Sequence, residues 1–282
     1  MLTANPTVFN FYLTLLDSFS EYLSSRYLDR SLDNPNHYKT LIFQKIVRMF
    51  HTLEYLIKGT QDEASARCVL RGILDSVITY CFIYQREDEN DMMFRHYLYI
   101  LDGFSDYKKA TIDGILEREE KPKLETIYNE VVTQINAKLS SHPYMKMKNK
   151  NVDTIIKNKN WKYESLVKPD KLKFGKMYKD VGFDEKLTNY YHGFLSQFAH
   201  GLFLSNTSCR DVGQLQKVLF ESIPIADRMV QGICCTFPRE ELLNNFLHSD
   251  SYNAVINDKD LDYDDLFLFA KAIINKNKTL YI

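Results

Sequence analysis

The chain is poor in the residues that make turns. Ten glycines and seven prolines are few for 282 residues, whereas a fold rich in strands needs Gly, Pro and Asn at each tight connection. The composition is otherwise ordinary for a globular protein, with 45% apolar and 26% charged residues. A chain of this length can bury a sizeable core in one domain. The shortage of turn residues therefore favours helices.

The cysteines form no recognisable framework. There are five, an odd number, and none lies in a C-x-x-C pair, so their spacing suits no zinc site. We interpret them as small core residues of a reducing compartment. The formal net charge of −1 excludes a molecule that binds polyanions over its whole surface. We predict neither a metal nor a cofactor.

The sequence also lacks a long hydrophobic run. The longest apolar stretch, "VLRGILDSVITYCFIY", is interrupted by Arg71 and Asp75, and a membrane span needs about 20 predominantly apolar residues. The N-terminal segment has neither a basic start nor a small-residue cleavage site, so it is not predicted to be a signal peptide. We expect a cytoplasmic protein without a membrane partner.

Helical periodicity dominates what is present. The first segment places apolar residues at steps of three and four, the spacing of one helix face: Phe9, Tyr12, Leu13, Leu16 and Phe19. Residues of about 60–85 are apolar nearly all round, which predicts a central helix, and Thr60 with Glu63 resembles a capping box at its start. We predict an all-α, irregular helical bundle forming a single domain over 1–282.

The periodicity fails over residues 142–179, hereafter the lysine-rich segment. It holds eleven lysines against three acids, with interleaved aromatic residues that could stack on bases while lysines hold phosphates. We predict a basic loop or flap that contacts RNA or ssDNA. The alternative is a solvated flap with no ligand. The predicted contact residues are Lys157, Lys159, Trp161, Lys162, Lys173 and Lys176.

Two apolar helices carry rows of polar residues at intervals of four, which places each row on one helix face. The rows are Arg67, Arg71 and Asp75, and Thr188, His192, Ser196 and His200. A buried guanidinium without a partner costs several kcal/mol, roughly, so the rows are expected to face each other. We predict a central cluster of Arg71, Asp75, Ser196 and His200, with Arg67 and His192 in support. There are two alternatives to a functional site. The polar residues could form a network that only fixes the register of the helices, or one of the rows could face solvent.

These motifs resemble an uncharacterised bacterial family of helical proteins, described only as a domain of unknown function. Its members have an R-x-x-x-E helix and, well downstream, an L-S-x-x-x-H helix. Arg71 matches the Arg, and Asp75 stands where that family usually has Glu. Leu195, Ser196 and His200 match the second motif. The resemblance spans about residues 40–235 and implies a helical fold, without an established activity.

The residues of the predicted cluster suit some chemistries and not others. One ion cannot join His192 and His200, which are two helical turns apart, about 12 Å. Ser196 has no G-x-S-x-G elbow and no evident oxyanion hole. By analogy with helical toxin and defence ribonucleases, an Arg and a His could supply a phosphate clamp and a base without a metal.

Two classes of function therefore stay open. The first is a nucleic-acid-directed enzyme of a stress or defence system, with His200 as acid and base, Arg71 as phosphate clamp and Asp75 as orienting group. The second is a non-catalytic helical interaction module in which the cluster is structural. A homodimer is expected in either class, because the amphipathic helices at both ends have more apolar face than one core needs.

Overall fold

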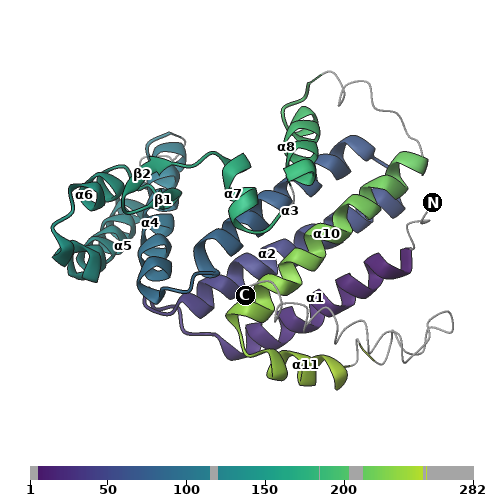
Figure 1. The fold of residues 1–282 in the computed structure, drawn as a ribbon, viewed down its shortest axis with the longest axis horizontal. Helices are drawn as coiled ribbons and strands as arrows, with labels where there is room; N and C mark the ends of the chain where they lie inside the picture. Colours follow the sequence, from purple (N-terminus) through teal and green to yellow (C-terminus); the bar gives the residue numbers. More distant parts are fainter. Residues whose placement is uncertain (1–5, 115–119, 184, 203–211, 250–251, 253–282) are drawn as a thin grey trace. The chain divides into compact units, whose positions relative to one another are not determined.

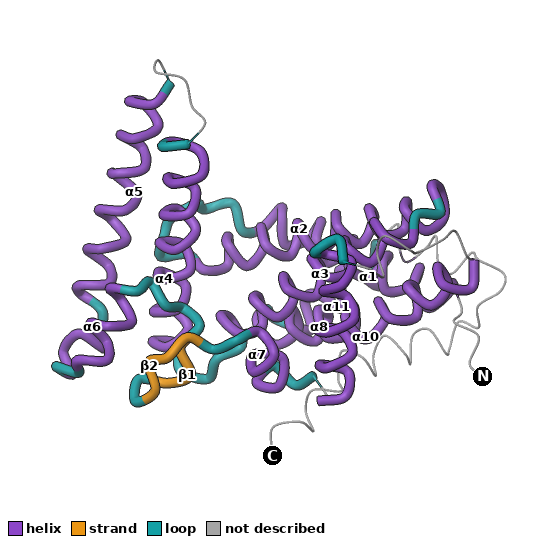
Figure 2. The backbone as a smooth tube through the Cα atoms, turned by 90° about the horizontal axis from the view of Figure 1, so that it is seen from above, coloured by secondary structure: helices purple, strands orange, loops and turns teal. Residues whose placement is uncertain are grey.

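The fold is described from a computed structural model, which covers residues 6–114, 120–183, 185–202, 212–249 and 252 (Figure 1). It is helical almost throughout, as the sequence predicts, and Figure 2 shows one small pair of strands among the helices. No helix in these described ranges is long and apolar enough to span a bilayer. The chain divides into two compact units, residues 1–30, 36–85 and 178–282, and residues 31–35 and 86–177. The single-domain organisation stays a prediction.

The first unit consists of long helices. They are α1 (Pro6–Arg26), α2 (Pro35–Tyr55), the short π-helix η1 (Leu56–Thr60), α3 (Glu63–Tyr84), α8 (Glu185–Ala199), α10 (Val212–Thr236) and α11 (Arg239–Leu247). Helix α3 packs against both α8 and α10, while α1 packs against α10 and α11. The prediction of a central apolar helix over about 60–85 is therefore confirmed.

Close packing explains why α3 can occupy this position. Its apolar side chains at Leu70, Ile73, Leu74 and Val77 are fully buried. Gly232 of α10 faces it, and a Cβ there would lie 3.2 Å from the Cys81 sulfur. The missing side chain lets the two helix backbones approach each other.

The apolar face predicted for α1 is buried along its whole length, from Phe9 at 1% exposure to Phe19 at 0%.

The capping box predicted at the start of α3 is wrong. Asp62 is the N-cap of α3, and its side chain accepts from the Ser65 amide at 3.1 Å. Thr60 ends η1 instead, and its hydroxyl donates to the Leu56 carbonyl, because the π-helix continues past the predicted start.

The second unit is smaller and holds most of the lysine-rich segment. Its helices are α4 (Glu89–Tyr107), the π-helix η2 (Lys108–Ile112), α5 (Lys121–Ser141), the 3-10 helix η3 (Pro143–Met147) and α6 (Lys150–Lys157). Strands β1 (Tyr163–Ser165) and β2 (Lys168–Lys171) pair antiparallel, with Tyr163 opposite Lys171. Helix α7 (Phe174–Asp180) follows, and the first unit resumes within it at Tyr178.

The lysine-rich segment is thus built of short regular elements where the sequence predicts a loop or flap. Arg95 of α4, 1% exposed, holds its middle part in place. The guanidinium donates to the carbonyls of Trp161 and Tyr163 at 3.0 and 2.9 Å, and lies 3.8 Å from the centre of the Tyr163 ring. A charge on a different helix therefore orders a segment whose own pattern is irregular, which sequence periodicity cannot reveal.

His142, between α5 and η3, is buried at 5% exposure. Its ring packs on Phe94 and Tyr144, and its Nδ1 accepts from the Tyr144 amide at 3.2 Å. Its Nε2 has no hydrogen-bond partner in the described part of the chain. Burial lowers the pKa of His142 below the usual 6.5, against the opposing effect of Asp88 and Asp91.

We predict that His142 makes the second unit less stable in mild acid. Because the pKa is lower in the folded state, the unfolded state binds more protons below about pH 6.5, and stability falls as the pH falls through this range. The slope from one such group is at most about 1.4 kcal/mol per pH unit. His142→Asn keeps an acceptor for the Tyr144 amide and removes the titration, so its melting temperature should change less between about pH 7.5 and 5.5 than that of the wild type. Equal changes in the two proteins would contradict the prediction.

Candidate functional site

Helices α3 and α8 run antiparallel where the two polar rows meet. The Cys68 thiol donates to the Phe198 carbonyl at 3.1 Å, and the Arg71 guanidinium approaches the His192 carbonyl at 3.5 Å. Residue numbers therefore rise along α3 as they fall along α8. The predicted meeting of the rows is seen at Arg71, Asp75 and His192, and we call these three with Tyr178 the Arg71 cluster.

Asp75 lies at the centre of the Arg71 cluster. Its Oδ2 accepts from Arg71 Nε at 3.1 Å, and its Oδ1 accepts from the Tyr178 hydroxyl at 3.4 Å. The Tyr178 ring is 6.0 Å from the ring of His192. The Arg71 side chain is 11% exposed and that of Asp75 is 33% exposed, so the cluster is partly open to water.

Partial burial shifts the titration of these groups. Burial raises the pKa of Asp75 above 3.8, although Arg71 opposes this shift. Burial also lowers the pKa of His192 below 6.5, and here the Arg71 charge acts in the same direction. His192 is therefore neutral at pH 7 and able to accept a proton, within range of the permanent charge of Arg71.

Ser196 and His200, predicted for the same cluster, are placed differently. The Ser196 hydroxyl donates to the His192 carbonyl one turn back, so it is engaged with the helix backbone. His200 lies beyond the last residue of α8 and its side chain is exposed. The structure does not bring its imidazole into the Arg71 cluster.

The end of α8 explains the position of His200. Gly201 has a positive φ of 61°. Its amide bonds to the Phe198 carbonyl, and the Leu202 amide bonds to the Gln197 carbonyl, which together form a Schellman motif. The helical row of Thr188, His192 and Ser196 therefore ends at Ser196, because α8 ends at Ala199, before His200. The glycine after His200 was the sequence signal for this stop.

Arg67, predicted as a supporting residue, forms a separate and fully buried network. Its guanidinium donates to Glu63 at 2.7 Å and to Glu221 at 2.6 Å, and its side chain is 0% exposed. The rings of Phe194 and Phe198 lie 4.7 and 5.2 Å from the guanidinium carbon. The network joins α3, α8 and α10.

Glu221 was missed at the sequence level, as was Tyr178. Glu221 also accepts from the hydroxyl of Tyr190, and its carbonyl accepts from the hydroxyl of Tyr191 at 2.7 Å. It is a single acid within an apolar part of α10, 5% exposed. An isolated carboxylate of this kind signals a buried cation elsewhere, but the sequence does not say which.

The predicted nucleic-acid contacts fall into two groups. Lys157, Lys173 and Lys176 are exposed. Lys159 instead donates to the Ser105 hydroxyl, and Lys162 lies 4.6 and 4.1 Å from the ring centres of Trp161 and Phe174.

Trp161 is buried in the structure. It is 5% exposed, and its indole nitrogen donates to Asp102 at 3.1 Å. Tyr144 and Tyr163 are buried as well. These rings pack inside the second unit and present no face on which a base could stack.

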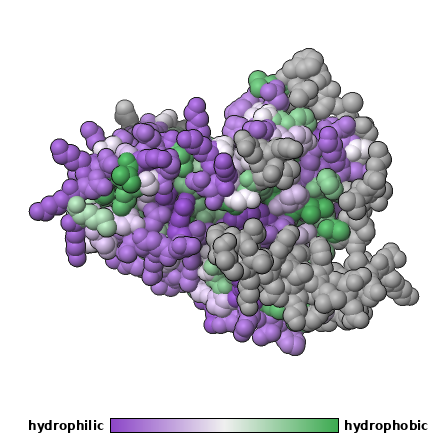
Figure 3. Space-filling model, in the orientation of Figure 1, coloured by the Kyte–Doolittle hydropathy of each residue, from purple (hydrophilic) through white to green (hydrophobic). Residues whose placement is uncertain are grey.

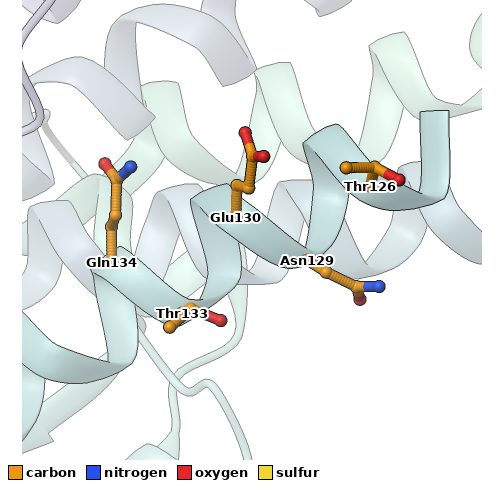
Figure 4. Close-up of a pocket in the computed structure, with 5 residues that line it drawn as sticks. All are labelled: Thr126, Asn129, Glu130, Thr133 and Gln134. Carbon is orange, nitrogen blue, oxygen red and sulfur yellow. The ribbon is translucent and has the colours of Figure 1, made fainter. Parts of the chain in front are cut away.

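Neither a metal site nor the pocket on α5 provides a stronger candidate among the described residues. Within the described ranges, no group of three or more His, Cys, Asp or Glu side chains is placed to hold a metal ion. A shallow pocket lies on α5, where the five lining side chains spread around one helix and do not converge (Figure 4). All five are polar: Thr126, Asn129, Glu130, Thr133 and Gln134.

We predict that Arg67 is needed for stability because two carboxylates are buried around it. Arg67→Met leaves Glu63 and Glu221 without their cation and should cost about 3–5 kcal/mol of unfolding free energy. The triple variant Arg67→Met/Glu63→Gln/Glu221→Gln removes all three charges and should recover most of that loss. Lys58→Met, which breaks an exposed pair with Glu54, is the control and should cost less than about 1 kcal/mol. Denaturant unfolding measures all four proteins, and an Arg67→Met variant as stable as the control would contradict this role.

Comparison with known protein families gives a match over most of the chain. A model of a family of unknown function, DUF5677, matches residues 36–213, which is more than half of the chain. No curated protein and no solved structure matches the chain significantly. The matched range contains α3 and α8, and hence both polar rows. The chain belongs to the DUF5677 family, a family of unknown function.

Proposed function

We propose that this protein binds RNA or ssDNA through the lysine-rich segment and acts on RNA, whose 2′-hydroxyl can serve as the nucleophile, at the Arg71 cluster by acid–base chemistry without a metal. The observation that carries the proposal is a partly open cluster in which the Arg71 guanidinium approaches the His192 main chain and the neutral His192 imidazole is within range of its charge. Such a pair supplies a proton acceptor and a cation for a phosphate group.

The surface of the second unit supports the binding step. Between residues 142 and 177, eight lysines are exposed against three exposed acids, and one of those acids, Glu164, is paired with Lys168. Figure 3 shows this unit as a mainly hydrophilic face with isolated apolar spots. Because the rings of Tyr144, Trp161 and Tyr163 are buried, binding would rest on the phosphate backbone and depend little on base sequence. The exposed lysines are Lys146, Lys148, Lys150, Lys157, Lys168, Lys171, Lys173 and Lys176.

The roles at the Arg71 cluster differ from those expected from sequence. His192 takes the place of His200 as the base, because His200 is exposed beyond the end of α8. Arg71 would hold the phosphate, and Asp75 would orient Arg71 through its Nε. Tyr178 would in turn orient Asp75. Positioning of a group by a second, buried group is common in such sites.

A second candidate is a non-catalytic helical interaction module. The Arg67 network favours it, because a fully buried cation paired with two buried carboxylates joins three helices.

Homodimerisation is likewise a proposal. The apolar face of α1 is covered by α10 and α11, and the predicted closing helix over about 261–277 lies outside the described residues. Light scattering of the purified protein measures the oligomeric state directly.

Removing exposed lysines should weaken binding and its dependence on salt. Replacing Lys157, Lys173 and Lys176 by Gln should lower the slope of log affinity against log salt by about 2, since each phosphate contact with a single strand contributes about 0.7. The control replaces Lys45, Lys58 and Lys217, exposed lysines of the first unit, and makes the same change in net charge. Fluorescence anisotropy with a labelled single strand measures both. Equal slopes in the two triple variants would remove the lysine-rich segment from the proposal.

His192 and His200 should differ in their effect on cleavage. His192→Asn should lower the rate of RNA cleavage in EDTA by about 10²–10⁴, the usual contribution of a general base. His200→Asn is the matched control and should stay within a few-fold of the wild type, because its side chain is exposed outside the cluster. Cleavage that needs His200 and not His192 would contradict the assignment, and a wild type without cleavage would favour the interaction module.

A further inference from the structure

The Arg71 cluster has unused hydrogen-bonding capacity. Arg71 Nε donates to Asp75, and Nη1 makes only a 3.5 Å approach to a carbonyl. Within the described ranges, no hydrogen-bond partner is found for Arg71 Nη2 or for the ring nitrogens of His192. A guanidinium with free N–H groups beside an imidazole can hold the oxygens of a tetrahedral anion.

The hydroxyl of Thr188 is a third group with unused hydrogen-bonding capacity. Thr188 lies one turn before His192 on the same face of α8, and is 6% exposed. Its hydroxyl has no hydrogen-bond partner among the residues that the structure describes. Because α3 and α8 are antiparallel, Thr188 lies toward the end of α3 that carries Asp75. Buried hydroxyls are rarely left without a partner, so this one is a candidate ligand contact.

Asp75 opposes the binding of an anion at this position. While Asp75 is ionised it cancels the charge of Arg71 and places carboxylate oxygens where an anion would approach. The charged or titratable groups around it are Arg71 on α3, Tyr178 on α7 and His192 on α8. Once Asp75 is protonated, the cluster has a net charge of +1 and the repulsion is gone. Partial burial already makes protonation of Asp75 easier than in water.

We propose that the Arg71 cluster binds one oxyanion of the phosphate and sulfate class between Arg71 and His192, and that Asp75 takes up one proton as the anion binds. This inference deepens the proposed function, since the anion would be a backbone phosphate of the nucleic acid. It does not depend on the exposed lysines of the lysine-rich segment, so it can fail or succeed separately.

Sulfate is the probe, because its charge stays constant between about pH 5 and 8. Isothermal titration calorimetry against chloride at constant ionic strength gives the affinity, and two buffers of different ionisation enthalpy give the number of protons taken up. For the wild type we expect an uptake approaching one proton and an affinity that rises by up to about tenfold for each pH unit lowered. Arg71→Gln should abolish binding.

The variants separate the sources of the proton. Asp75→Asn should bind sulfate with an affinity independent of pH above about pH 6.5, without proton uptake, and more tightly than the wild type at pH 7.5. His192→Asn should bind more weakly and keep the proton uptake. Glu54→Gln, which removes an exposed carboxylate paired with Lys58, should behave like the wild type.

Two results would overturn the inference. One is a wild type that does not prefer sulfate to chloride at any pH tested. The other is an Asp75→Asn variant that still takes up a proton on binding. A parallel titration with a dinucleoside monophosphate distinguishes a site for backbone phosphate from one for free anions. The lysine triple variant should weaken nucleic-acid binding and leave sulfate binding unchanged, which keeps this test apart from that of the proposed function.

Discussion

The buried charge of Arg67 is the constraint on which the first unit depends. A guanidinium at 0% exposure must be matched by carboxylates, and these come from Glu63 on its own helix and Glu221 on α10. Two aromatic rings of α8 cover the guanidinium. The three helices cannot slide past one another without separating these charges. The register that brings Arg71 next to His192 therefore follows from the pairing one turn earlier.

Arg67 and Arg71 show how one helical row can serve two purposes. They are the same residue type four positions apart, yet the first is sealed and paired on both sides, whereas the second is partly exposed and paired with a single half-buried acid. A sealed pair favours one arrangement of helices and leaves little capacity for a ligand. A partly open pair retains N–H groups that a ligand can use. The difference in surroundings, and not in spacing, separates a structural role from a chemical one.

Much of this arrangement could be predicted from the sequence, because helical spacing is a local property. The periodicity identified α1 and its buried face, the central helix α3 and the two rows that meet at Arg71 and His192. The distant partners of Arg67 and Asp75 could not be found in this way, since Glu221 and Tyr178 lie more than 100 positions away in the chain. The glycine after His200 was a readable signal for the end of α8, and it outweighed the apparent continuation of the row.

The lysine-rich segment shows a second limit of local patterns. Its composition suggested a loop with aromatic rings ready to stack, but Arg95 and Asp102 on α4 hold the carbonyls and the indole of that segment from outside it. Tyr144, Trp161 and Tyr163 are drawn inward and most of the lysines stay at the surface, because burying an aromatic ring stabilises the fold whereas burying a lysine costs free energy. What composition predicts correctly is the local excess of positive charge. The net charge of −1 conceals it, since the balancing acids lie elsewhere in the sequence. A polyanion would meet a locally basic surface although the whole chain is nearly neutral.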